Sequence, residues 1–279
     1  MIFMRIKRTK MSYHTTHNPG AFTKRQNTRL LYFMKRLTQS LMRGKVLEFI
    51  NYFVSEGVNM WNDRVSFLQL GSSLHCNICG YYGRFVHKSN RLGISWNSIC
   101  PKCDSRSRHR GLYILYQKLI PKDKSILHFA PEPILSRLFS HSNLYKTTDY
   151  LLEDVDYKGE DIQKLTISSE TFDWVLCNHV IEHVSDDGKA FSEINRILKK
   201  DGCAIITLPG DYNRKNTVFF KDLSLNGHFR DYGWDVLDKL CLYFSEVNPV
   251  DLSSIATTEK VAIKVKDYAF VCKKRIELA

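Results

Sequence analysis

The stretch from Ile126 to Val184 constrains the fold most, because strand-like and helix-like segments alternate along it. Three runs with strand character follow one another, Ser125–Glu132, Leu144–Asp149 and Phe172–Val184. Strands that alternate with helices favour a doubly wound α/β sheet whose strands run parallel. Ligands of such sheets bind beyond the carboxyl ends of the strands. The sequence therefore predicts an α/β fold with a ligand crevice at that edge.

An acidic residue, Asp149, stands at the end of the second of these runs. At this position of a nucleotide-binding sheet, a carboxylate accepts hydrogen bonds from ribose hydroxyls. Asp149 is therefore the candidate ribose ligand of a nucleotide-like cofactor.

Four cysteines form two C-x2-C pairs, Cys76 with Cys79 and Cys100 with Cys103, separated by twenty residues. Two such pairs supply the four thiolates of a tetrahedral zinc site, at the upper end of the usual spacing. Four thiolates leave zinc no open position, so the metal would be structural. Structural cysteines without a metal are the alternative.

Composition limits the class of protein. The 279 residues suffice for one α/β core and a small accessory domain, and no stretch approaches the ~18 apolar residues of a membrane span. Eleven of the 41 basic residues occur by Lys45, before the first acid, Glu48, whereas the remainder has 30 basic and 29 acidic residues. The body of the protein therefore lacks a broad nucleic-acid footprint. Paired cysteines favour a reducing compartment, so we expect a cytoplasmic protein.

The basic arm, residues 1–57, includes an apolar stripe at helical spacing, formed by Leu30, Met34, Leu37 and Leu41. Such an amphipathic helix can rest on an anionic membrane surface or on RNA, which would make the protein peripheral at the membrane in the first case. It can equally dock on its own protein with a solvated basic face. An Arg-rich, acid-poor arm is also typical of a mitochondrial transit peptide.

Together the motifs resemble class I S-adenosylmethionine (SAM) dependent methyltransferases of the type 11-like group, in the subgroup where a zinc ribbon precedes the domain. The resemblance rests on the C-x2-C and C-P-x-C pairs, the basic run Ser105–Arg110, and the segments H-F-A-P-E, N-H-V-I-E-H-V and K-K-D-G-C-A-I-I-T-L-P, over roughly residues 74–273. It implies a doubly wound, seven-stranded Rossmann-like sheet that Phe244–Val250 and Tyr268–Lys273 close as an antiparallel pair. The implied domains are the basic arm (1–57), the ribbon (74–110) and the methyltransferase domain (111–279).

The resemblance also assigns the cofactor crevice. The loop His128, Phe129, Ala130, Pro131 and Glu132 replaces the usual Gly-rich loop, so we interpret it as a variant SAM loop, with a degenerate, non-binding loop as the alternative. Pro131 and Glu132 should begin the next helix, whose N-terminus would attract the SAM carboxylate.

Further along the chain, Asp161 and Ile162 match the positions that contact the adenine amino group and stack on the ring. Asp161 can alternatively cap a helix from Gln163 onward. Asn178 and His179 follow the buried strand beside the methionine portion of the cofactor.

Two segments are expected to form the binding site of the methyl acceptor. Glu182 and His183 follow the same strand, and the insert Pro209–Gly233 between the fifth strand and a helix from Trp234 includes His228. His228 is the first candidate for a general base, and Glu182 and His179 are further catalytic candidates. Glu182 and His183 could instead orient the loop and cap a helix starting near Asp186, and the charges of the insert could simply be solvated.

The basic residues Arg106, Arg108, His109 and Arg110 link the cysteine segment to the methyltransferase segment. They could bind phosphate or carboxylate, or form an ion-pair hinge.

The leading function is a SAM-dependent methyltransferase that acts on an O or N atom of a small molecule or saccharide. An RNA methyltransferase, in which ribbon and arm hold the RNA, is the second hypothesis. A non-catalytic adaptor with a SAM fold is the third, suggested by the glycine-free loop.

Overall fold

The computed structural model describes residues 74–90, 93–220, 227–255 and 267–275, and the single helical residues Ile50, Phe53, Val54 and Gly57. The chain divides into two compact units, residues 1–58 with 89–94, and residues 59–88 with 95–279. Most of the basic arm, with its predicted membrane or RNA contacts, lies outside the described residues. The cysteine pairs and the whole predicted crevice belong to the second unit.

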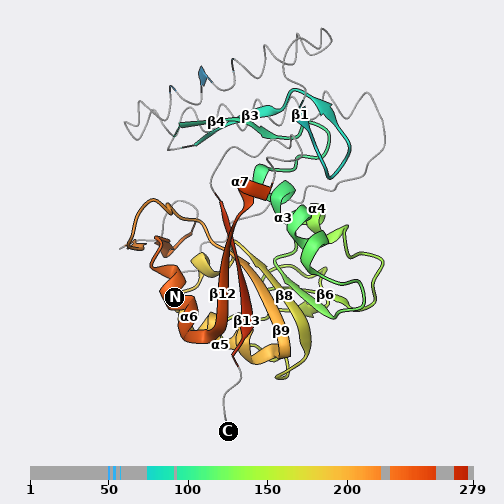
Figure 1. The fold of residues 1–279 in the computed structure, drawn as a ribbon, viewed down its shortest axis with the longest axis vertical. Helices are drawn as coiled ribbons and strands as arrows, with labels where there is room; N and C mark the ends of the chain where they lie inside the picture. The colour runs from blue at the N-terminus through green and yellow to red at the C-terminus, as the bar shows by residue number, and fades with distance from the viewer. Residues whose placement is uncertain are drawn as a thin grey trace. The chain divides into compact units, whose positions relative to one another are not determined.

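A seven-stranded sheet forms the centre of the second unit, in the order β12, β13, β9, β8, β5, β6, β7 (Figure 1). Its strands are β5 (Ile126–Phe129), β6 (Tyr145–Asp149), β7 (Tyr157–Lys158), β8 (Phe172–Asn178), β9 (Leu198–Thr207), β12 (Phe244–Asp251) and β13 (Tyr268–Lys274). Strands β7, β6, β5, β8 and β9 run parallel to one another, whereas β13 is antiparallel to both β9 and β12. The predicted α/β sheet and its antiparallel closing pair are confirmed.

Helices cover both faces of this sheet. They are α3 (Ser107–Leu119), α4 (Pro133–Ser136), η2 (Ile181–His183), α5 (Asp187–Ile197), α6 (Val236–Tyr243) and α7 (Leu252–Ile255). Successive strand residues point to opposite faces, so neighbours such as Ile126 and Leu127 join different cores. Leu127 packs in the core that includes α5 and α6, whereas Ile126 packs with α3, α4 and α7. The sheet is therefore doubly wound.

Helix α5 shows how the sequence directs this packing. Its N-cap, Asp186, accepts a hydrogen bond from the backbone N–H of Lys189. Ala190, Ile194 and Ile197 then recur at helical spacing and are fully buried in the core. One face of the helix is thus apolar, and it packs against β9.

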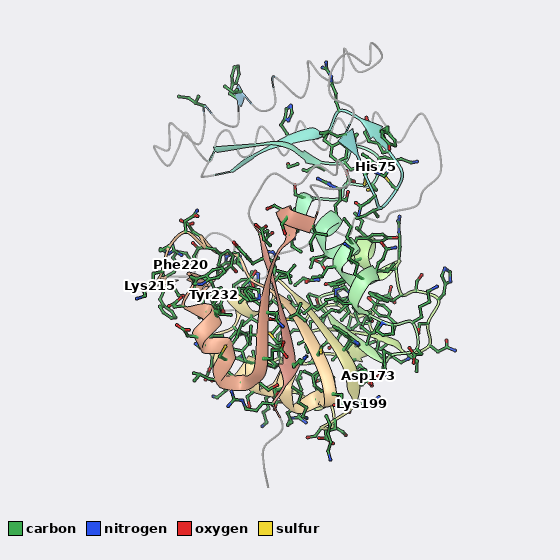
Figure 2. The ribbon with its side chains drawn as sticks, viewed as in Figure 1. His75, Asp173, Lys199, Lys215, Phe220 and Tyr232 are labelled. Carbon is green, nitrogen blue, oxygen red and sulfur yellow. The ribbon has the colours of Figure 1, made fainter. Side chains whose placement is uncertain are left out.

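Three predicted boundaries were wrong. Strand β9 begins at Leu198 rather than Ala204, because the extended chain already pairs with β8 there, and Lys199 makes a 2.9 Å ion pair with Asp173 of β8 (Figure 2). No helix begins at Gln163, because the Asp161 carboxylate accepts the backbone N–H of Gln163 at 2.9 Å and a bridge to Lys164 closes a turn. Helix α6 also begins at Val236, two residues after the expected Trp234.

Short strands form three separate pairs, β1 (Leu74–His75) with β2 (Tyr82–Gly83), β3 (Val86–Asn90) with β4 (Gly93–Ile99), and β10 (Val218–Phe219) with β11 (Arg230–Asp231). Within the described ranges, no helix combines the length and the apolar character that crossing a membrane requires.

Candidate active site

The loop after β5 takes a strained path although it has no glycine. Ala130 adopts φ 46°, in the left-handed region that side chains disfavour. Glu132 is the N-cap of α4 and Pro133 its first residue, so this helix begins two residues later than predicted. Its four residues make a single turn, which limits the dipole that was expected to attract the SAM carboxylate.

A buried polar network lies at the base of this loop. The His128 Nδ1 and Nε2 atoms lie 2.8 Å from the Tyr145 hydroxyl and 3.2 Å from Glu132 Oε2, respectively. Asn178 Nδ2, from the end of β8, donates to the same Glu132 oxygen at 3.1 Å. Residues from β5, the loop and β8 are therefore fixed to one another at the carboxyl edge of the sheet.

Sequence reasoning missed Tyr116, which completes this network from α3. Its hydroxyl is fully buried and donates to Asn178 Oδ1 at 3.1 Å, across 62 residues of chain. Thr207 Oγ1, at the end of β9, donates to the same oxygen at 3.3 Å. A tyrosine on an apolar helix stripe looks like an ordinary core residue, so no local signal distinguished it.

Glu132 is held ionised within this network. Burial is the largest influence and raises its pKa, but the hydrogen bond and charge of His128, with contributions from His109 and Arg108, lower the pKa overall to about 2. A negative charge is therefore fixed beside the crevice at neutral pH.

Asp149 ends β6 next to this network, where the sequence placed it. Its Oδ1 accepts hydrogen bonds from the backbone N–H groups of Leu151 and Leu152, at 2.7 and 2.9 Å. These bonds orient the carboxylate at the strand end. Asp161 lies in the turn described above, and Ile162 is only 4% exposed and packs in the core with α5 and α6.

A second strained residue, His179, follows the end of β8. It adopts φ 52°, and its backbone N–H donates to the carbonyl of Thr207 at 2.9 Å. Strained non-glycine residues cluster at functional sites, where the surrounding structure enforces them. Ala130 and His179 follow the neighbouring strands β5 and β8, so two of the four positive-φ non-glycine residues in the described ranges lie at the predicted crevice, whereas Asp104 and Glu170 lie elsewhere.

The structure brings the catalytic candidates together around Glu182. Its Oε1 lies 3.5 Å from His179 Nδ1 and 3.8 Å from His183 Nε2. The rings of His183 and His228 meet edge to face with centroids 4.7 Å apart. Burial lowers the pKa of His228, which favours a neutral imidazole with one basic nitrogen at neutral pH. Asp186 caps α5, so Glu182 and His183 do not serve as that cap.

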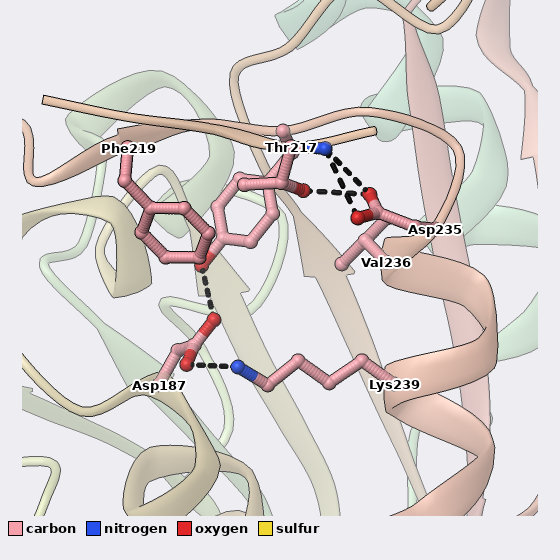
Figure 3. A pocket seen from close by; sticks show the side chains of 7 residues that line it. Asp187, Thr217, Phe219, Asp235, Val236 and Lys239 are labelled. Atoms are coloured by element: carbon pink, nitrogen blue, oxygen red, sulfur yellow. Dashed lines mark hydrogen bonds and ion pairs between the residues drawn. The ribbon is translucent and has the colours of Figure 1, made fainter. Parts of the chain in front are cut away.

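The insert between β9 and α6 packs partly inward. Arg230 is 2% exposed, and its Nη1 lies 2.8 Å from Oδ1 of Asp187. Lys239 contacts the same oxygen, and the Tyr232 hydroxyl donates to the other carboxylate oxygen of Asp187. Asp187, Tyr232 and Lys239 line a cavity of about 230 Å³ that Thr217, Phe219, Asp235 and Val236 complete (Figure 3). Arg230 and Tyr232 are thus buried and paired, so Arg230 is not one of the solvated charges of the insert.

The four cysteines of the two C-x2-C pairs lie together. The Sγ atoms of Cys76 and Cys103 are 3.7 Å apart, and those of Cys79 and Cys100 are 3.6 Å apart. All four lie within 4.8 Å of one another. Their small core, with Phe85, is separate from the two cores of the sheet.

The basic link anchors α3 to the cysteine segment mainly through Arg110. This side chain is fully buried, donates to the carbonyl oxygens of Ser105 and Ser98 at 2.6 and 3.0 Å, and lies over the Phe85 ring. His109 is also buried, which lowers its pKa to about 3. Arg110 thus ties the start of α3 to the backbone of the cysteine segment.

Residues 137–206, from the end of α4 through β9, match the family model described as a methyltransferase domain. This range includes Asp149, His179 and Glu182. This part of the chain therefore carries a methyltransferase domain. No curated protein matches the chain.

Several solved structures are similar to this chain. A protein of Pyrococcus horikoshii is 20% identical, with 61% of this chain and 90% of that chain covered and a TM-score of 0.43. The 1,6-didemethyltoxoflavin-N1-methyltransferase of Burkholderia thailandensis, with bound 1,6-didemethyltoxoflavin and S-adenosylhomocysteine, is 14% identical over 61% of this chain and 79% of that chain, with a TM-score of 0.44. Phosphoethanolamine N-methyltransferase 2 of Haemonchus contortus, in complex with SAM, is 14% identical over 60% and 52%, with a TM-score of 0.39.

Proposed function

We propose that this domain transfers the methyl group of SAM to an oxygen or nitrogen of a small molecule or saccharide, at the carboxyl edge of the sheet. The observation that supports the proposal is the meeting, at that edge, of a strained cofactor loop and a cluster of imidazole and carboxylate groups. Ala130 follows β5 and Asp149 ends β6 at this edge, and His179 and Glu182 follow β8 at the same edge. SAM and the methyl acceptor would thus be held in one site, and aligning the two is the main requirement for an in-line methyl transfer.

On the cofactor side, the Asp149 carboxylate accepts hydrogen bonds from both ribose hydroxyls, and Asp161 receives the adenine amino group. Ile162, which packs in the core, leaves no exposed face for stacking on the ring. The loop from His128 to Glu132, with Asn178 and His179, holds the methionine portion. The ionised Glu132 carboxylate suits the positively charged amino group there, since its pKa lies near 2. SAM, when bound, supplies a methyl group on a sulfonium, which is already an activated leaving group.

On the acceptor side, His228, His179 and Glu182 position the nucleophile and take up its proton. His179 Nδ1 faces Glu182, and Nε2 of the same ring has no hydrogen-bond partner among the described residues. A neutral imidazole nitrogen of this kind can accept a proton from a hydroxyl.

Replacing His228 by Ala should lower kcat by about 10²–10⁴-fold, the usual contribution of general acid–base catalysis. SAM affinity should change less than about twofold, because His228 lies on the acceptor side. His141→Ala is the matched control, since His141 is exposed and lies outside this cluster. Single-turnover kinetics and SAM calorimetry check both quantities; a His228→Ala enzyme with wild-type turnover contradicts the assignment.

The four cysteines are proposed to bind one structural zinc ion. A tetrahedral ion with Zn–S bonds near 2.3 Å requires sulfur separations of about 3.8 Å. The observed 3.6 and 3.7 Å fit this requirement. Among the described residues, the fully buried core of this segment consists of Cys76, Phe85 and Cys100, and a metal would add stability that so small a core does not supply.

Replacing Cys100 by Ser is expected to remove one zinc ion per chain and to loosen residues 74–103. The sheet should stay folded, since its two cores include none of the four cysteines. Metal analysis and circular dichroism test both parts, with Cys241→Ser, an exposed cysteine of α6, as the control. Equal zinc content in the two variants would refute the assignment.

A further inference from the structure

A second group of metal-binding side chains lies outside the cysteine cluster. Glu182, His183 and His228 each offer one ligand atom, and the three atoms lie within 4.8 Å of one another. Two imidazoles and one carboxylate are the ligand set of many catalytic zinc sites, in which a fourth position stays open.

The Glu182 carboxylate is the strongest sign that this group binds a cation. Its side chain is 1% exposed, and its Oε2 has no hydrogen-bond partner within the described part of the chain. Burying an ionised carboxylate costs several kcal/mol unless a cation or donors compensate it. A divalent cation beside Glu182 would balance this charge.

His183 is oriented as a metal ligand would be. Its Nδ1 lies 3.2 Å from the carbonyl oxygen of Gly227. A carbonyl only accepts hydrogen bonds, so Nδ1 carries the proton and Nε2 keeps its lone pair. This Nε2 is the atom that lies 3.8 Å from Glu182 Oε1. A ligating histidine typically donates its other N–H to a carbonyl in this way.

A backbone bond joins the two segments that supply the ligands. The N–H of Phe229 donates to the carbonyl of Glu182 at 2.8 Å, which holds His228 beside the η2 turn. Around a tetrahedral ion with bonds of about 2.0–2.1 Å, ligand atoms lie about 3.3 Å apart. The separation between His183 and Glu182 needs only a small side-chain rotation to reach this value, and His183 is 39% exposed and has room for it.

We propose that Glu182, His183 and His228 form a divalent transition-metal site, with zinc as the probe, whose open position takes an oxygen of the methyl acceptor. The role at the acceptor rests on the proposed function, whereas the metal site stands on the geometry alone. With the ion bound, His228 would be a ligand rather than the general base; the ion would make the acceptor hydroxyl more acidic, and its proton would pass to Nε2 of His179. The oxygen then bonds to the methyl carbon as the carbon–sulfur bond breaks, and the electron pair stays on sulfur.

The test counts zinc ions in the full-length protein after metal removal and reconstitution with Zn²⁺ and dialysis. Wild type should hold two ions per chain, one in each site. The double variant His183→Ala, His228→Ala should hold one, and the exposed control His141→Ala should hold two. Cobalt substitution identifies which ion is lost, because the thiolate charge-transfer absorption of the cysteine site should be unchanged in the double variant.

Glu182→Gln keeps the shape of the site but removes its charge, so it should weaken Zn²⁺ binding at this site by tenfold or more. One ion in wild type, or two ions in the double variant, overturns the inference. These outcomes are separable from the proposed function, because SAM binding is measured independently. A protein with one zinc ion that still binds SAM refutes only the second metal site.

Discussion

Replacing Asp187 by Ala is expected to lower the free energy of unfolding by about 3–5 kcal/mol, the usual effect of breaking a buried ion pair. Asp187 is 4% exposed and Arg230 is 2% exposed, so removing the carboxylate leaves a guanidinium charge in the protein interior without its counterion. Lys239 and the Tyr232 hydroxyl lose the same partner. Equilibrium unfolding in urea measures the loss.

Asp186→Ala provides the matched control, because the neighbouring residue is an acid that caps the same helix. Losing that cap should cost about 1 kcal/mol. Equal losses for the two variants would mean that the pairing of Asp187 with Arg230 adds nothing beyond local helix stability.

The pH dependence of stability should follow from the same pair. Burial is the largest influence on Asp187 and raises its pKa, but pairing with Lys239 and Arg230 holds the pKa below its ordinary value of 3.8. A depressed pKa stabilises the folded state above the unfolded-state value and loses this effect as the pH falls through the folded-state value. The difference in stability between wild type and Asp187→Ala should therefore be full at neutral pH and shrink below pH 3.8.

Replacing Asp149 by Ala should weaken SAM binding by at least about tenfold, equivalent to 1.4 kcal/mol. Hydrogen bonds from two ribose hydroxyls to a carboxylate contribute about 1.5–3 kcal/mol each, against about 1 for neutral pairs. Asp149→Asn should lose less affinity, because the amide keeps an acceptor for the N–H groups of Leu151 and Leu152.

Asp154→Ala is the control for charge, since Asp154 is an exposed acid five residues along the same segment. Its SAM affinity should match that of wild type. If all three variants bind SAM as wild type does, the ribose lies elsewhere and the assignment of Asp149 is refuted.

The sequence was sufficient to predict the sheet because its signals are local. The short apolar runs of β5, β8 and β9, which are buried almost continuously, and the acid at the end of β6 can be read from a few residues each. The helix expected at Gln163 failed for a local reason too, since the Asp161 side chain competes for the backbone N–H that a helix would use.

Contacts between distant residues could not be predicted in this way. Tyr116 reaches Asn178 across 62 residues, and Asp187 meets Arg230 only when the insert folds against α5. Neither pair has a fixed spacing that a single sequence reveals. The loop after β5 is an intermediate case, because the missing glycine suggested a degenerate loop, while the backbone of Ala130 still takes the left-handed conformation that glycine favours.

Calorimetric titration of the wild-type protein with SAM tests the central claim most directly, namely that the carboxyl edge of the sheet between β6 and β8 holds this cofactor. We expect saturable binding of one SAM per chain, with an affinity that is weakened at least about tenfold in Asp149→Ala and unchanged in His228→Ala. Absence of SAM binding by the folded, zinc-loaded wild type would contradict it and would favour a non-catalytic adaptor.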